Sequence, residues 1–343
     1  MASLNKVYFR ADAYPAIGTG HVMRCFALAN AVMARAIPTC FIGRIEDSVV
    51  MERIRRAGHE LIALDADAST SAWLATTETS VGDWVVLDGY EFGIDDHAAI
   101  KKAGPALLVI DDTNELSSYL CDVLLNQNFY ASDLPYSCMD QTRLLLGPRY
   151  ALLRDEFVKS SPIRESRSSA RLLVSLGGSD PHGVGVVVMN ALASVVDREL
   201  DVLVLTGSSG GHFAQIEVEA VKARKFGHRI EIQAFTDDMP GAMAWADVGL
   251  IGAGTTSLEV AYMGLPCLVL ILADNQIKVA NAMQEAGIAE SFGWYEDVSP
   301  QLMACGISAL FADVSKRNLM TNLSKKIVDG AGAQRVVDTM LGY

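Results

Sequence analysis

The fold is decided by the stretch Val7-Tyr-Phe-Arg-Ala-Asp-Ala-Tyr-Pro-Ala-Ile-Gly-Thr-Gly-His-Val-Met-Arg24. Its first residues are a short apolar run of strand-forming residues, and after Asp12 a turn containing proline and glycine follows. From about Gly20 the apolar residues take helical spacing, and we expect this helix to reach about Arg35. A strand, a glycine-rich turn and a helix in this order make one βα unit.

The same alternation recurs along the chain. In the first half the predicted strands are Val7–Ala11, Thr39–Gly43, Leu61–Leu64, Trp84–Leu87, Leu107–Ile110, Val123–Leu125 and Leu144–Leu146. In the second half they are Arg171–Leu176, Val202–Leu205, Ile230–Phe235, Val248–Ile251 and Cys267–Leu272. Between the two sets, residues 160–169 are polar, rich in serine and without periodicity, which is typical of a linker.

A chain of 343 residues is too long for one ordinary core, so we expect two α/β domains, each a doubly wound parallel sheet. We expect residues 1–160 to form the first Rossmann-like domain and residues 170–315 the second. Residues 316–343 read as C-terminal helices that could pack back on the first domain. Sheets of this kind bind ligands at the carboxyl ends of their strands, here facing a shared cleft.

The composition excludes several classes of partner. The formal net charge is −13 and no run of Lys or Arg occurs, so nucleic acid and membrane surfaces are not expected partners. The six cysteines are scattered singly, without metal-ligand spacing, and no cofactor or metal is expected. No stretch has the length or pattern of a membrane helix or an export signal, which predicts a cytoplasmic protein. Oligomeric state leaves no signal in the sequence.

His21 is the candidate catalytic base. It stands at the start of a helix, directly after a turn that contains Gly18 and Gly20. The amino end of a helix disfavours a protonated imidazole, so we expect the pKa of His21 to be lowered. The alternatives are a dinucleotide turn and a histidine with only a structural role, but Met23 occupies the place of the third glycine in the dinucleotide motif.

Acidic residues end two predicted strands of the first half. Asp88 closes one and is followed by Tyr90, while Asp111 and Asp112 close the next. At this edge of the sheet a carboxylate can orient a base or bind sugar hydroxyls. Aspartate also caps the helix that follows a strand, and the sequence leaves both interpretations open.

Two small-residue loops follow strands in the second half, and both suit a diphosphate because they expose backbone amides. One contains Gly177 and Gly178; the other begins at Gly252 and runs through Gly254, Thr255 and Thr256 to Glu259. Glu259 is placed to bind ribose hydroxyls, although Thr256 and Glu259 also fit a capping box. Asn275 and Gln276, after a later strand, either contact the ligand or only begin a helix.

Taken together, five motifs resemble the UDP-2,4-diacetamido-2,4,6-trideoxy-β-L-altropyranose hydrolase family. The motifs are Arg10-Ala-Asp12, Ile17-Gly-Thr-Gly-His-Val-Met-Arg24, Asp122-Val-Leu-Leu-Asn-Gln-Asn128, Tyr150-Ala-Leu-Leu-Arg-Asp-Glu-Phe157 and Leu176-Gly-Gly-Ser-Asp180. The resemblance implies a GT-B type fold, a UDP-sugar substrate, and release of UDP by water with inversion, in the pathway to pseudaminic acid.

The resemblance also implies roles for individual residues. His21 matches the general base of that family, Tyr90 a tyrosine that lines the sugar site, and Glu259 the acidic residue near the ribose. The residues predicted to bind substrate are Asp12, Gly18, Gly20, Arg24, Asp88, Tyr90, Arg154, Gly177, Gly178, Gly252, Gly254, Thr255, Thr256, Glu259, Asn275 and Gln276. The family usually has histidine where this chain has Gly89, which leaves the exact sugar open.

The sequence therefore predicts a metal-independent UDP-sugar hydrolase in which His21 activates water. Two other functions stay open. One is a glycosyltransferase that passes the sugar to a hydroxyl acceptor, and the other is a protein that binds a nucleotide sugar without turnover.

Overall fold

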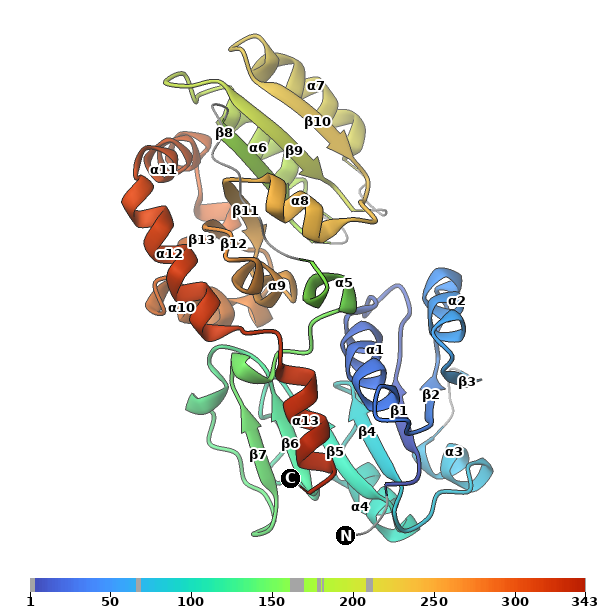
Figure 1. Cartoon of the computed structure of the whole chain (residues 1–343). Helices are drawn as coiled ribbons and strands as arrows, with labels where there is room; N and C mark the ends of the chain where they lie inside the picture. The colour runs from blue at the N-terminus through green and yellow to red at the C-terminus, as the bar shows by residue number, and fades with distance from the viewer. Residues whose placement is uncertain are drawn as a thin grey trace. The chain divides into compact units, whose positions relative to one another are not determined.

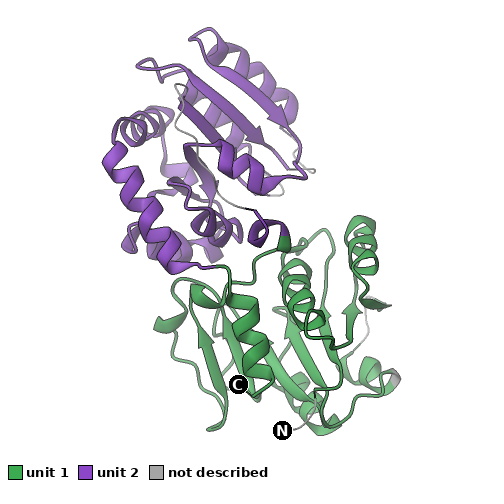
Figure 2. Ribbon diagram, viewed as in Figure 1, with its two compact units in different colours: residues 1–155, 330–343 green, residues 156–329 purple. Residues whose placement is uncertain are grey.

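The computed structural model describes residues 4–65, 69–160, 170–177, 180, 182–207 and 212–342. It divides into two compact units, which Figures 1 and 2 show as ribbons. Unit 1 is residues 1–155 with 330–343, and unit 2 is residues 156–329. Each unit contains one sheet of parallel strands with helices around it, so the predicted pair of Rossmann-like domains is confirmed.

In unit 1 the described residues form a sheet with the strand order β3-β2-β1-β4-β5-β6-β7. All neighbouring strands pair in parallel. The strands are β1 (Val7–Ala11), β2 (Thr39–Gly43), β3 (Glu60–Ala63), β4 (Trp84–Asp88), β5 (Ala106–Ile110), β6 (Val123–Asn126) and β7 (Arg143–Leu146). Every residue of β1 and β2 is buried, as expected for central strands covered on both faces.

Two layers of helices cover the unit 1 sheet. Alternate residues of a strand face opposite sides, so Phe9 packs with Leu28 and Val336 on one face, while Tyr8 packs with Trp73 and Ile100 on the other. The helices of unit 1 are α1 (Gly20–Met33), α2 (Ser48–Arg56), α3 (Thr70–Thr76), α4 (Ile94–Ala103) and α13 (Gly332–Met340), with the short 3₁₀ turns η1 (Ala131–Asp133) and η2 (Pro148–Tyr150). Helix α5 (Asp155–Val158) stands at the division between the units.

Unit 2 has the strand order β10-β9-β8-β11-β12-β13 among its described residues, again all parallel. The strands are β8 (Ala170–Ser175), β9 (Leu200–Leu205), β10 (Arg229–Gln233), β11 (Val248–Gly252), β12 (Cys267–Ile271) and β13 (Ala289–Trp294). The helices are α6 (Val184–Leu192), α7 (Phe213–Arg224), α8 (Met239–Trp245), α9 (Thr256–Met263), α10 (Ile277–Glu285), α11 (Pro300–Ala312) and α12 (Val314–Ile327), with the 3₁₀ turns η3 (Asp274–Gln276) and η4 (Tyr295–Asp297).

Strand β13 was not predicted from the sequence. Its residues Ala-Glu-Ser-Phe-Gly-Trp are mostly half-buried and carry no apolar run. Gly293 has a φ of 84°, and the pairing with β12 shifts register beside it. An irregular edge strand of this kind lacks the pattern that marks a central one.

The C-terminal helices are divided between the two units. Helix α12 packs on α9 within unit 2, so the boundary predicted at residue 316 falls inside this helix. Helix α13 lies in unit 1 against α1. Most of the predicted linker, residues 161–169, lies outside the described residues. Over the described part of the chain, no helix has both the length and the apolar character needed to cross a membrane.

The close approach of α13 to the rest of unit 1 gives a first testable prediction. A Cβ atom on Gly332 would collide with the backbone of Ala151, including its carbonyl oxygen. We expect Gly332→Ala to lower the free energy of unfolding by about 1–3 kcal/mol, the usual cost of overpacking. Thermal unfolding measures this loss. Gln334→Ala, an exposed change in the same helix, is the control, and equal stability of the two variants would contradict the prediction.

Candidate active site

The candidate site lies at the carboxyl edge of the unit 1 sheet, where β1, β4 and β5 end next to one another. After β1 the chain makes a turn in which the Gly18 amide donates to the carbonyl oxygen of Tyr14 at 2.9 Å. Gly18 has a φ of 73°, a conformation that favours glycine. Gly20 then begins α1, so the turn places His21 in the first turn of the helix.

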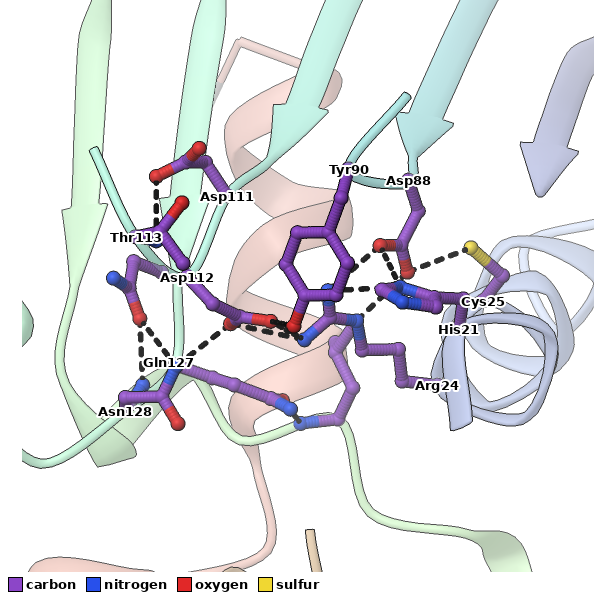
Figure 3. Close-up of polar contacts among 12 residues, drawn as sticks. His21, Arg24, Cys25, Asp88, Tyr90, Asp111, Asp112, Thr113, Gln127 and Asn128 are labelled. Carbon is purple, nitrogen blue, oxygen red and sulfur yellow. Dashed lines mark hydrogen bonds and ion pairs between the residues drawn. The ribbon is translucent and has the colours of Figure 1, made fainter. Parts of the chain in front are cut away.

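His21 contacts the carboxylate that ends the neighbouring strand. Its Nδ1 lies 2.7 Å from Oδ1 of Asp88, which is fully buried (Figure 3). The Sγ of Cys25, one helical turn further along α1, lies 3.5 Å from the other oxygen of Asp88. Two side chains of α1, His21 and Cys25, therefore contact the carboxylate at the end of β4.

Arg24 joins this carboxylate to a second one. Its Nε and Nη2 donate to Asp88 at 2.7 and 2.6 Å, and its Nη1 donates to Asp112 at 2.8 and 3.0 Å (Figure 3). Asn128 donates to the same Asp112 carboxylate at 2.7 Å, and the Tyr130 hydroxyl donates to the Asp112 carbonyl oxygen at 2.8 Å. A buried guanidinium is thus neutralised by two carboxylates that come from adjacent strands.

The pKa of His21 shifts in the direction opposite to the one expected from its place on the helix. Burial lowers its pKa, but the charge of Asp88 and the hydrogen bond to it outweigh burial, so the pKa of His21 is raised. The expected lowering by the helix end was therefore wrong in sign. The pKa of Asp88 is held low, since Arg24 and His21 outweigh the burial that would raise it.

The charge on Asp88 also settles which nitrogen of His21 carries the proton. An ionised carboxylate can only accept, so Nδ1–H donates to Asp88. In the neutral ring Nε2 is then the nitrogen that can accept a proton. This is the arrangement in which a carboxylate orients a histidine for general base catalysis.

Tyr90 stands over the imidazole. Its ring meets that of His21 edge to face, with centroids 5.0 Å apart and planes at 84°. Its hydroxyl lies 3.5 Å from Oδ2 of Asp112, and burial together with the Asp112 charge raises its pKa to about 12. More than half of its surface remains exposed, at 56%, so a neutral tyrosine is available to a ligand beside His21.

None of the acidic residues at these strand ends caps a helix. Gly93 is the N-cap of α4, so Asp88 is free for the contacts above. The Asp111 carboxylate instead accepts from the backbone of Thr113 and Asn114, at 3.1 and 2.7 Å. It also accepts from the hydroxyls of Tyr119 and Tyr136, at 2.9 and 2.8 Å. The helix-capping alternative was therefore wrong for all three aspartates.

Asp12 and Arg154 are the other predicted side chains of unit 1. Asp12 pairs with the Arg10 guanidinium and accepts from the backbone amide of Arg44 at 2.7 Å, which ties the ends of β1 and β2 together. Arg154 is half-buried directly before α5. The structure thus brings together His21, Arg24, Asp88 and Tyr90.

Gly89 lies between Asp88, the last residue of β4, and Tyr90. A Cβ atom there would lie 2.5 Å from Oε2 of Glu91. The Glu91 carboxylate therefore occupies the space where the histidine usual in the resembling family would begin.

The predicted residues of unit 2 gather at the carboxyl ends of β8, β11 and β12, which are adjacent strands. Gly177 follows β8 with a φ of 104°, and Gly178 lies outside the described residues. Gly252 is the last residue of β11, and Gly254 follows in the loop before α9. A Cβ atom on Gly252 would lie 2.9 Å from the side chain of Leu272, so the strand end requires a small residue.

The amino end of α9 differs from the predicted capping box. Thr255 is the N-cap and Thr256 the first helical residue, and the Thr255 side chain makes no capping hydrogen bond. Glu259 lies in the first turn. Ser257 is buried, and within the described residues its hydroxyl has no hydrogen-bond partner. The sequence analysis did not single out Ser257, although it stands inside the predicted loop.

Asn275 and Gln276 lie in η3, after β12. The Gln276 side chain accepts from the backbone amide of Leu272 at 3.0 Å, so this oxygen helps to close the turn. Among the described residues, no cluster of three or more His, Cys, Asp or Glu side chains could hold a metal ion. Metal independence of the reaction stays a prediction.

Comparisons with known proteins extend this description. The structure of MurG from Acinetobacter baumannii superposes with a TM-score of 0.74 over 98% of this chain and all of that one, at 15% sequence identity. The fold is GT-B. Residues 173–333 match the family model of the glycosyltransferase family 28 C-terminal domain.

Two curated proteins are similar over most of their length. The spore coat polysaccharide biosynthesis protein SpsG of Bacillus subtilis is 24% identical over 323 residues, which is 93% of each chain. The UDP-2,4-diacetamido-2,4,6-trideoxy-β-L-altropyranose hydrolase of Campylobacter jejuni is 27% identical over 226 residues, or 62% of this chain and 73% of that protein.

The raised pKa of His21 gives a second prediction. The protonated pair with Asp88 stabilises the fold fully below the unfolded pKa of about 6.5, and this contribution is lost as the pH rises through the folded value. We expect Asp88→Asn to lower the pKa of His21. Proton NMR of the imidazole measures it, with the His21 signal assigned from a His21→Asn spectrum.

Asp122→Asn is the control for this experiment, because Asp122 pairs with Lys101 on a different edge of the unit. It should leave the His21 titration unchanged. A His21 pKa that is the same in Asp88→Asn as in the parent protein would show that the carboxylate does not set it.

Proposed function

We propose that this protein is a nucleotide-sugar hydrolase that releases UDP from a UDP-linked 2,4-diacetamido-2,4,6-trideoxyhexose, with the β-L-altropyranose as leading substrate. Its place is then the biosynthesis of nonulosonic acids such as pseudaminic acid. The observation that carries the proposal is the His21–Asp88 pair, in which Nδ1 is bound and Nε2 is the proton acceptor.

The reaction needs one base and one site for negative charge. Nε2 of His21 takes a proton from water while the water oxygen forms a bond to the anomeric carbon. The bond from that carbon to the diphosphate oxygen breaks, its electron pair leaves with UDP, and the configuration inverts. Because its pKa is held low, Asp88 stays ionised, and its negative charge stabilises the imidazolium that forms.

The loop before α9 is suited to the diphosphate of the leaving group. Backbone amides at the start of a helix and the helix dipole favour negative charge without a metal. The buried hydroxyl of Ser257 adds an unused donor at the same place. Glu259, in the first turn of the same helix, would accept hydrogen bonds from the ribose hydroxyls.

A glycosyltransferase is the second candidate, favoured by the match of residues 173–333 to the family 28 domain. The same base would then take the proton of an acceptor hydroxyl rather than of water. A protein that binds a nucleotide sugar without turnover is the third, and the oriented His21–Asp88 pair argues against it.

One experiment separates these functions. The purified protein is incubated with a panel of UDP-sugars and no acceptor, and UDP and free sugar are followed by NMR. We expect both products from the diacetamido sugar, at the same rate with and without EDTA. Turnover only after an acceptor is added would establish the transferase, and binding without turnover the third function. A rate that needs Mg²⁺ or Mn²⁺ would contradict metal independence.

Replacement of the base tests the mechanism. We expect His21→Asn to lower kcat by about 10²- to 10⁴-fold, the usual loss when a general base is removed, with UDP affinity unchanged. His59→Asn is the control, because His59 is also a buried imidazole but contacts Thr39 and Asn30. Turnover of His21→Asn within tenfold of the parent would exclude His21 as the base.

Glu259 gives the corresponding test in unit 2. A hydrogen bond to a charged group contributes about 1.5–3 kcal/mol, so Glu259→Gln should weaken UDP binding by about 10- to 100-fold. Calorimetry measures the affinity, with the exposed change Glu285→Gln as a charge-matched control. If only the melting temperature falls, the carboxylate is structural.

A further inference from the structure

A cavity of about 60 Å³ lies in unit 1 directly beside the His21 cluster. His21, Asp88 and Tyr90 form part of its wall. Apolar side chains, among them Leu87 and Val109, form another part. A ligand whose reacting carbon lies at His21 can therefore place a small substituent in this cavity.

His97 also lines the cavity and is not used by the mechanism above. It belongs to α4, is 1% exposed, and stacks on Tyr119 with ring centroids 6.0 Å apart. Within the described residues, its Nδ1 has no hydrogen-bond partner. A buried polar group without a partner costs about 1–3 kcal/mol, so the position calls for a ligand that supplies one.

Two other polar groups of the wall already have partners. Asp111 accepts four hydrogen bonds, from Thr113, Asn114, Tyr119 and Tyr136. The Tyr119 hydroxyl is used in one of them. Burial lowers the pKa of His97, so its ring is neutral at physiological pH and offers one hydrogen bond at Nδ1, as donor or as acceptor.

We propose that this cavity is the subsite for an N-acyl substituent of the sugar, and that the imidazole of His97 hydrogen-bonds the amide of that substituent. The inference rests on the proposed use of a nucleotide-linked acylamino sugar. His97 would then be a residue that determines specificity, whereas His21 carries out the reaction.

The chemistry of the wall favours an acyl group over other substituents. The methyl group of an acetyl substituent would pack against Leu87 and Val109, and its amide would hydrogen-bond the neutral imidazole of His97. An anionic substituent would meet the carboxylates of Asp88 and Asp111. About 10–15 Å³ of such cavity space holds one water molecule, so the cavity accommodates a group larger than a single hydroxyl.

The test compares kcat/KM for the diacetamido sugar with analogues in which the C2 or the C4 acetamido group is replaced by hydroxyl or lengthened to butanamido. In the parent protein, one of the two positions should show a loss of at least tenfold for both changes. His97→Leu should remove most of the preference for acetamido over hydroxyl at that position. His97→Asn, which retains a polar group near Nδ1, should keep part of it.

His59→Asn is the control for loss of a buried imidazole, and it should leave the ranking of the sugars unchanged. If His97→Leu lowers kcat/KM equally for every sugar, or if no acyl position matters in the parent protein, the subsite assignment is overturned while the hydrolase proposal stands. If the parent protein turns over none of the sugars, with or without an acceptor, the proposed function itself fails. The acyl-length series on the parent protein gives its answer even if a His97 variant does not fold.

Discussion

The arrangement of the unit 1 site depends on one buried guanidinium. Arg24 is 8% exposed and lies between Asp88 at the end of β4 and Asp112 just after β5. Both carboxylates contact this one cation, and the loss of either partner would leave a buried charge uncompensated. The triad therefore fixes α1 to two strands at once. His21, three residues before Arg24 on the same helix, is positioned as a consequence.

Regular parts of the fold could be predicted from the sequence because central parallel strands are buried on both faces and therefore apolar throughout. This holds for β1 and β2, and it fails for β13, where a half-buried strand with a glycine carries no such pattern. The turn to His21 was also predictable, because Gly18 and Gly20 mark it in the sequence.

The function of individual side chains was less predictable, because it depends on contacts between distant parts of the chain. The direction of the His21 pKa could not be found from its helix position, since Asp88 lies 67 residues away. His97 became recognisable only when folding placed it beside a cavity, and the contact of Asp112 with Arg24 likewise depends on the fold. The same limit applies to Glu259, whose helix begins one residue earlier than a capping box with Thr256 would require.

The return of the chain to unit 1 has a consequence for the order in which the protein matures. The apolar face of α1 is covered in part by Val336, Val337 and Met340 of α13, which are synthesised after all of unit 2. During synthesis, unit 2 can therefore fold its own sheet and helices while the core of unit 1 still lacks α13. The emergence of α13 from the ribosome is then the step that completes the core of unit 1, although most of that core was synthesised first.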